Sequence, residues 1–193
     1  MWRRSRMRYF AAGLVGFSLL FQSGIASAQA KASKMFLLED AGNSQWCFYT
    51  TESTWTAKVQ EVGAMTVGTL HYSNDHLLQI DVAETDESGD WTAYDRYFFG
   101  DHGQVVKLSR LLNVLPGDRS VSQTFSISNG KATKTATSEK QLSTGKPRTT
   151  PTADWLPDVS IKTATKMFPF TALLSRRGLR TSPRSCVKVS ASQ

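Results

Sequence analysis

The sequence predicts a mostly β fold: an antiparallel meander curled into a barrel-like or sandwich domain, with one short C-terminal helix and a basic tail. Three observations lead to this fold class. Segments rich in aromatic and β-branched residues alternate with turn-forming clusters, and the turns follow one another at intervals of about 10–16 residues. No segment of helical length and period lies between these turns. Intervals this short accommodate single strands joined by hairpins, as in sandwiches and small barrels.

The central element is a predicted hairpin from Trp91 to Val114. Trp91–Phe99 and Gln104–Val114 have the composition of strands and are joined across the loop Gly100-Asp-His-Gly103. Glycine at both ends of this loop allows the chain to reverse, because glycine reaches positive φ without steric cost. We therefore expect this hairpin to contribute the most buried side chains of the sheet.

The strands before this hairpin are less uniform in pattern. Leu78, Ile80 and Val82 alternate with polar residues, which is typical of a strand with one buried face. Thr56–Val62 fits either a strand or a single helical turn, and we interpret it as a strand. After a loose leader at Lys31–Lys34, the predicted elements are Met35–Leu38, Gln45–Thr51, Thr56–Val62, Met65–Tyr72 and Leu77–Thr85.

Another hairpin follows the central one. Ser120–Ser128 alternates regularly, and Asn129-Gly130 is the pair most favoured in a two-residue type I′ turn. The turn predicts that Ser128 lies opposite Lys131 and Ile127 opposite Ala132 in a return strand, Lys131–Thr137.

The C-terminal part contains one predicted helix. Pro169 suits the first helical position, Phe170, Leu173 and Leu174 form an apolar stripe, and Gly178 ends the helix after Arg176 and Arg177. We expect this helix to cover an open end of the sheet and Leu179–Gln193 to form a tail.

Residues 1–30 have the pattern of a cleaved secretory signal peptide. Four arginines precede the apolar run Phe10–Phe21, and small residues offer cleavage after Ala28 or Ala30. The run is shorter than the ~20 residues that span a bilayer, so no transmembrane segment is expected after cleavage. The predicted remainder comprises a meander at 31–145, a polar proline-containing linker at 146–157, and a short helix with a basic tail at 158–193 on the same domain.

The formal net charge of +7 belongs partly to this leader. Without its four arginines, 19 Lys and Arg face 16 Asp and Glu, a net charge of +3. Eight acids lie between Leu70 and Asp101, whereas the chain after Asp158 carries only basic charged residues. Such asymmetry bears on partners and not on fold. It makes an anionic envelope surface a candidate partner, beside an apolar ligand or a peptide, while no feature favours nucleic acid.

No motif of a known catalytic or metal site occurs in the chain. The three histidines lack zinc-ligand spacing, glycine-rich phosphate loops and a Gly-x-Ser-x-Gly elbow are missing, and we predict no metal and no cofactor. A hydrolase would need a site assembled only in three dimensions around the Trp91–Val114 hairpin. Its least implausible members are Asp95, Arg96, Asp101, His102 and Arg110.

Aromatic residues of the central hairpin are the candidate ligand-binding set. Trp91, Tyr97 and Phe99 share one face of the strand, and Tyr94 lies on the other. A strand that is apolar on both faces is either covered on both or lines a groove. We favour coverage by the C-terminal helix over an open groove.

Two cysteines in an exported chain suggest one disulfide, Cys47–Cys186. An intermolecular bridge and two free thiols are the alternatives that the sequence leaves open. Taken together, the sequence predicts an exported, single-domain β protein of the periplasm or exterior. A non-catalytic binding or structural role is favoured over the hydrolase.

Overall fold

The protein folds into one antiparallel sheet of nine strands. The computed structural model describes residues 32–148, 156–174 and 184–188 of the compact unit 31–193. The strands are β1 (Ala32–Asp40), β2 (Gln45–Tyr49), β3 (Thr66–Ser73), β4 (His76–Thr85), β5 (Trp91–Phe99), β6 (Val105–Val114), β7 (Arg119–Ser128), β8 (Lys131–Gln141) and β9 (Arg184–Lys188). The helices are the α-helices α2 (Glu52–Val62) and α3 (Thr171–Leu174) and the 3₁₀ turns η1 (Ala41–Asn43) and η2 (Thr165–Met167).

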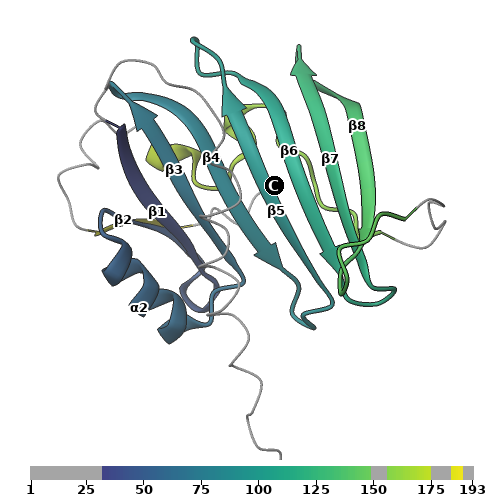
Figure 1. Cartoon of the computed structure of the whole chain (residues 1–193). Coiled ribbons are helices and arrows are strands. Elements are labelled where there is room, and N and C mark those ends of the chain that lie inside the picture. Colours follow the sequence, from purple (N-terminus) through teal and green to yellow (C-terminus); the bar gives the residue numbers. More distant parts are fainter. Residues whose placement is uncertain (1–31, 149–155, 175–183, 189–193) are drawn as a thin grey trace, which may run out of the picture. The chain divides into compact units, whose positions relative to one another are not determined.

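The strand order is β8-β7-β6-β5-β4-β3-β1-β2-β9. Strands β1 to β8 are labelled in Figure 1. From β3 to β8 each strand pairs with the next in sequence, which is the predicted meander, and the mostly β antiparallel fold class is confirmed. The described part of the sheet does not close on itself, since β8 and β9 are its two edge strands. Strand β1 begins at Ala32, so the expected loose leader at Lys31–Lys34 is largely strand.

The hairpin between β7 and β8 forms as its turn residues predict. Asn129 and Gly130 both have positive φ, at 51° and 72°, as a type I′ turn requires. Ser128 pairs with Lys131 and Ile127 with Ala132, which confirms the predicted register.

One face of the sheet, here called the inner face, carries the main core. Leu37, Ile80 and Leu108 lie on it, and all three are fully buried. The face is covered by residues 156–174, here called the covering segment, which lies behind the strands in Figure 1. Its Phe168 and Phe170 are 3% and 1% exposed and pack on the aromatic rings of the strands.

The opposite face, here called the outer face, is covered near β1 and β2 by helix α2. The prediction of a strand at Thr56–Val62 is wrong, because Trp55 and Val59 are four residues apart and bury one helical face against the sheet. The Trp55 ring packs on Phe36, and its Nε1 donates to the carbonyl of Leu37 at 2.7 Å. Gly63 ends the helix with a φ of 62°. No helix among the described residues is long and apolar enough to cross a bilayer.

The C-terminal region differs from its prediction in two ways. The helix is shorter than expected and begins at Thr171, after Pro169, while Arg176, Arg177 and Gly178 lie outside the described residues. Part of the expected tail is strand β9, which pairs with β2 along its whole length. Five residues of mixed polarity carry little strand signal alone, and the ladder of β2 and the disulfide supply the order.

The disulfide between Cys47 and Cys186 is confirmed as an intramolecular bond. The two residues face each other across β2 and β9 with their Cα atoms 4.0 Å apart. The bond closes a separation of 139 residues, and it joins the edge strand β9 to the body of the sheet.

Candidate functional site

A buried ion pair lies near the middle of the inner face. Asp95 on β5 and Arg110 on β6 are direct cross-strand partners and are 5% and 6% exposed. Arg110 donates from Nε and Nη2 to the two carboxylate oxygens of Asp95, at 2.7 and 2.6 Å. Burial disfavours the guanidinium charge, but the bonds to Asp95 outweigh this effect, so the pKa of Arg110 is raised. The pair is bidentate and mutually neutralising.

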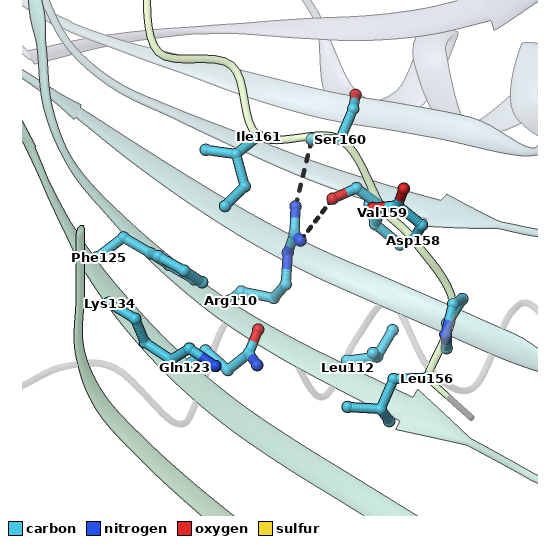
Figure 2. A pocket seen from close by; sticks show the side chains of 11 residues that line it. Arg110, Leu112, Gln123, Phe125, Lys134, Leu156, Asp158, Val159, Ser160 and Ile161 are labelled. Carbon is cyan, nitrogen blue, oxygen red and sulfur yellow. Dashed lines mark hydrogen bonds between the residues drawn. The ribbon is translucent and has the colours of Figure 1, made fainter. Parts of the chain in front are cut away.

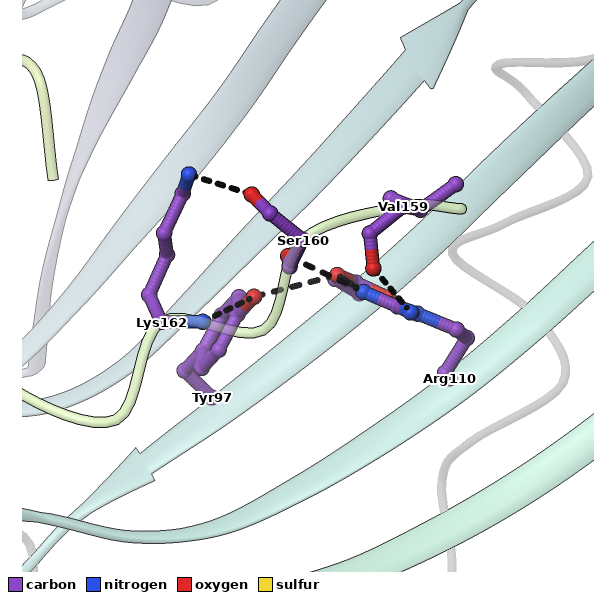
Figure 3. Close-up of polar contacts among 6 residues, drawn as sticks. Tyr97, Arg110, Val159, Ser160 and Lys162 are labelled. Carbon is purple, nitrogen blue, oxygen red and sulfur yellow. Dashed lines mark hydrogen bonds and ion pairs between the residues drawn. The ribbon is translucent and has the colours of Figure 1, made fainter. Parts of the chain in front are cut away.

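Arg110 and the neighbouring Tyr97 bind the backbone of the covering segment. Arg110 donates from Nη1 to the carbonyl of Val159 at 2.7 Å and from Nη2 to the carbonyl of Ser160 at 3.3 Å (Figure 3). The Tyr97 hydroxyl donates to Asp95 at 3.1 Å and accepts from the backbone N–H of Lys162 at 3.3 Å. Burial and the charge of Asp95 raise the pKa of Tyr97, so the phenol stays protonated. These contacts fix the position of the covering segment against the sheet.

A cleft lies between this segment and strands β6, β7 and β8, and it is here called the β6–β8 cleft. Its volume is about 400 Å³, within the range of roughly 300–1,000 Å³ for ligand pockets. The sheet supplies one side and the covering segment the other (Figure 2). The lining residues are Arg110, Leu112, Gln123, Phe125, Lys134, Leu156, Pro157, Asp158, Val159, Ser160 and Ile161.

A smaller cavity of about 200 Å³ lies under the next part of the covering segment. Its walls combine acidic residues with aromatic rings, among them Glu39, Glu84 and Trp46. Loss of hydration and the negative charge of Asp95 raise the pKa of Glu84. Lys162 also lines this cavity and favours the ionised form of Glu84. The cavity is too small for most ligands on its own.

The structure separates the five residues considered for a hydrolase. Asp95 and Arg110 form the buried pair described above. Arg96 lies on the outer face, and Asp101 and His102 are exposed in the β5–β6 turn. The five residues therefore do not converge on one site.

Arg96 belongs to a second polar cluster, on the outer face. Asp81 accepts from Arg96 Nε at 2.7 Å and lies 3.0 Å from His71 Nε2. Burial alone would raise the pKa of Asp81, but the bonds from His71 and Arg96 prevail and lower it. Neither His71 nor Asp81 lines either of the two cavities described above.

The four aromatic candidates for ligand binding do not share one groove. Tyr97 and Phe99 are buried under Phe168, with ring centroids 5.0 and 6.2 Å away. Trp91 is half-buried beside a small cluster at the other end of β5, and Tyr94 lies half-buried on the outer face. Coverage of the inner face thus comes mainly from the phenylalanines that precede helix α3.

Sequence reasoning missed the residues that form the β6–β8 cleft. Two of these residues, Leu156 and Pro157, belong to the predicted linker 146–157. Another linker residue, Pro147, forms a β-bridge with Lys140 on β8. Lys134 lies on the inner face together with Glu139, five positions away, because a bulge interrupts the alternation of β8. Neither a bulge nor a covering loop has a sequence signal that would have placed these residues together.

The chain matches no protein-family model, no curated protein and no solved structure.

Proposed function

We propose that this protein is an exported, non-catalytic binding module of the bacterial envelope or exterior, and that the β6–β8 cleft holds an apolar or amphipathic ligand. The observation that carries the proposal is the cleft itself: about 400 Å³ between the sheet and a covering segment that is fixed in place. Leu112 and Phe125 supply apolar surface from the strands, and Leu156 and Ile161 supply it from the covering segment.

The leader at residues 1–30 and the disulfide support export. Disulfides form and persist in oxidising compartments such as the periplasm and the exterior. Cys47 and Cys186 are the two cysteines of the chain, and they are bonded to each other.

The anchoring of the covering segment favours binding without large rearrangement. Arg110 is held by Asp95 and at the same time contacts the carbonyls of Val159 and Ser160, so the wall of the cleft is held in place without a ligand. Preorganisation of this kind lowers the entropy cost of binding. The same contacts engage the buried acid and base with each other, which favours binding over proton-transfer chemistry at this site.

Titration with the neutral fluorescent probe N-phenyl-1-naphthylamine tests the proposal. The purified protein is expected to bind the probe saturably, and Ile161→Trp, which fills the cleft, is expected to weaken binding about tenfold or more. Leu78→Trp is the matched control, because Leu78 is 48% exposed on β4 and does not line the cleft. Absence of binding to the folded wild-type protein, or equal loss in both variants, would overturn the proposal.

A further inference from the structure

We propose that the ligand of the β6–β8 cleft carries an anionic group, a carboxylate or a phosphate, and that Lys134 and Gln123 bind this group. The inference rests on the proposed function, since it names the chemistry of the ligand for the same cleft. The polar lining residues divide into those that already have hydrogen bonds or ion pairs and those that have none among the described residues.

Lys134 is an exposed cation of the lining, and no acid among the described residues pairs with it. It pairs in register with Phe125, so its stem begins beside an aromatic residue of the cleft. Glu139 lies on the same face of β8, but its carboxylate accepts from Arg119 at 2.8 and 3.0 Å and lies 3.6 Å from Arg148. Within the described part of the chain, Lys134 has neither a hydrogen bond nor an ion pair.

Two further N–H donors are available among the lining residues. Gln123 lies directly opposite Arg110 on the adjacent strand, and its side-chain amide has no hydrogen-bond partner among the described residues. Arg110 uses four of its five N–H groups on Asp95, Val159 and Ser160, which leaves one Nη1 hydrogen without an acceptor there. Figure 2 shows the side chains of Lys134, Gln123 and Arg110 on neighbouring strands along one side of the cleft.

None of the acids of this region is paired with Lys134 among the described residues. Asp95 is committed to Arg110 and to Tyr97. Asp158 lines the cleft from the covering segment, where its side chain is exposed and makes no ion pair with Lys134. An ammonium beside apolar side chains and a free amide is complementary to the acidic end group of an amphiphile, because bonds from charged donors to an anion are the stronger class.

Chain-matched amphiphiles separate this inference from the proposed function. Dodecanoate, dodecyl phosphate, 1-dodecanol and dodecyltrimethylammonium would each be used to displace N-phenyl-1-naphthylamine from the full chain. We expect the two anions to bind about tenfold more tightly than the alcohol, and the cation to bind most weakly. A preference between the two anions identifies whether the end group is a carboxylate or a phosphate.

Variants at Lys134 then assign the preference to that residue. Lys134→Met keeps an unbranched apolar stem without the ammonium group and should remove the advantage of the anions without changing the affinity for 1-dodecanol. Lys134→Glu should reverse the order in favour of dodecyltrimethylammonium. Lys140→Met is the matched control, since Lys140 lies on the same strand with the opposite facing.

The results distinguish the two proposals. If the naphthylamine probe binds but anion and alcohol compete equally, or if Lys134→Met weakens both equally, the inference is overturned and the proposed function stands. If the probe itself does not bind the folded protein, the proposed function fails.

Discussion

Arg110 brings a positive charge into the inner face of the sheet, where an unpaired guanidinium would lose most of its hydration. Asp95 restores the lost interactions through a bidentate pair, and the remaining donors reach the carbonyls of Val159 and Ser160. One side chain therefore links the sheet to the covering segment. The pair adds little net stability as an isolated unit, but removing one member leaves a buried charge uncompensated.

We expect Arg110→Met to lower the free energy of unfolding by about 3–5 kcal/mol, measured by urea denaturation. The reason is the isolated carboxylate of Asp95, so the double variant Asp95→Leu with Arg110→Met should recover part of the loss. Arg148→Met is the control at a more exposed pair, where Arg148 lies 3.6 Å from Glu139, and it should cost no more than about 1 kcal/mol. If Arg110→Met and Arg148→Met lower the free energy of unfolding by equally small amounts, the carboxylate of Asp95 is not left buried without a partner.

At the scale of the elements, one position of the sheet accepts only glycine unless the neighbouring backbone moves. Gly68 on β3 lies between Leu37 on β1 and Val82 on β4. A Cβ atom at Gly68 would lie 2.7 Å from the backbone oxygen of Asp81 and 3.5 Å from the Leu37 side chain. A side chain at this position would therefore collide with the backbone of β4.

Gly68→Ala should therefore lower the free energy of unfolding by about 1–3 kcal/mol, because backbone of β4 has to move to make room. The control is Gly42→Ala, where the nearest atom, Asp40 Oδ1, would be 3.7 Å from the new Cβ. Thermal or urea unfolding of both variants checks the difference. A stability of Gly68→Ala equal to that of Gly42→Ala would mean that the strands adjust without cost.

The sequence predicted those elements whose signals are local. The β7–β8 hairpin follows from Asn129-Gly130, because two residues determine both the turn and the register. Helix α2 was missed because only Trp55 and Val59 are buried along its length, too few for a clear helical period. The cleft was not predictable, because it depends on the β8 bulge and on a covering segment whose contacts with Arg110 span 49 and 50 residues.

For the molecule as a whole, the disulfide ties its C-terminal strand to an early one. Cys47 is fully buried on β2, and Cys186 lies on the edge strand β9. Strand β9 has five residues, so its pairing with β2 alone is a small contribution. The bond restricts the unfolded chain more than a bond that closes a short loop would, since the entropy of closure grows slowly with loop length.

Replacement of both cysteines by serine should lower the free energy of unfolding by up to about 4–5 kcal/mol, as the chain-entropy model gives for a loop of this length. Urea denaturation of the oxidised wild-type protein and of the double variant, both without reductant, checks this loss. The control is the wild-type protein with its disulfide reduced, which should have about the same stability as the double variant. Thiol titration of the denatured, unreduced protein should find no reactive thiol. Unchanged stability of the double variant would mean that the disulfide does not stabilise the folded sheet.

The pairing of β2 with β9 also determines the order in which the sheet can assemble. Strands β3 to β8 join through local hairpins and can pair as soon as each emerges, whereas the outer edge of β2 waits for a strand more than 130 residues later in the chain. During synthesis, that edge and the Cys47 thiol remain open to other chains and other thiols. A chain truncated before Arg184 would keep the residues of the meander but leave this edge of β2 without its partner strand.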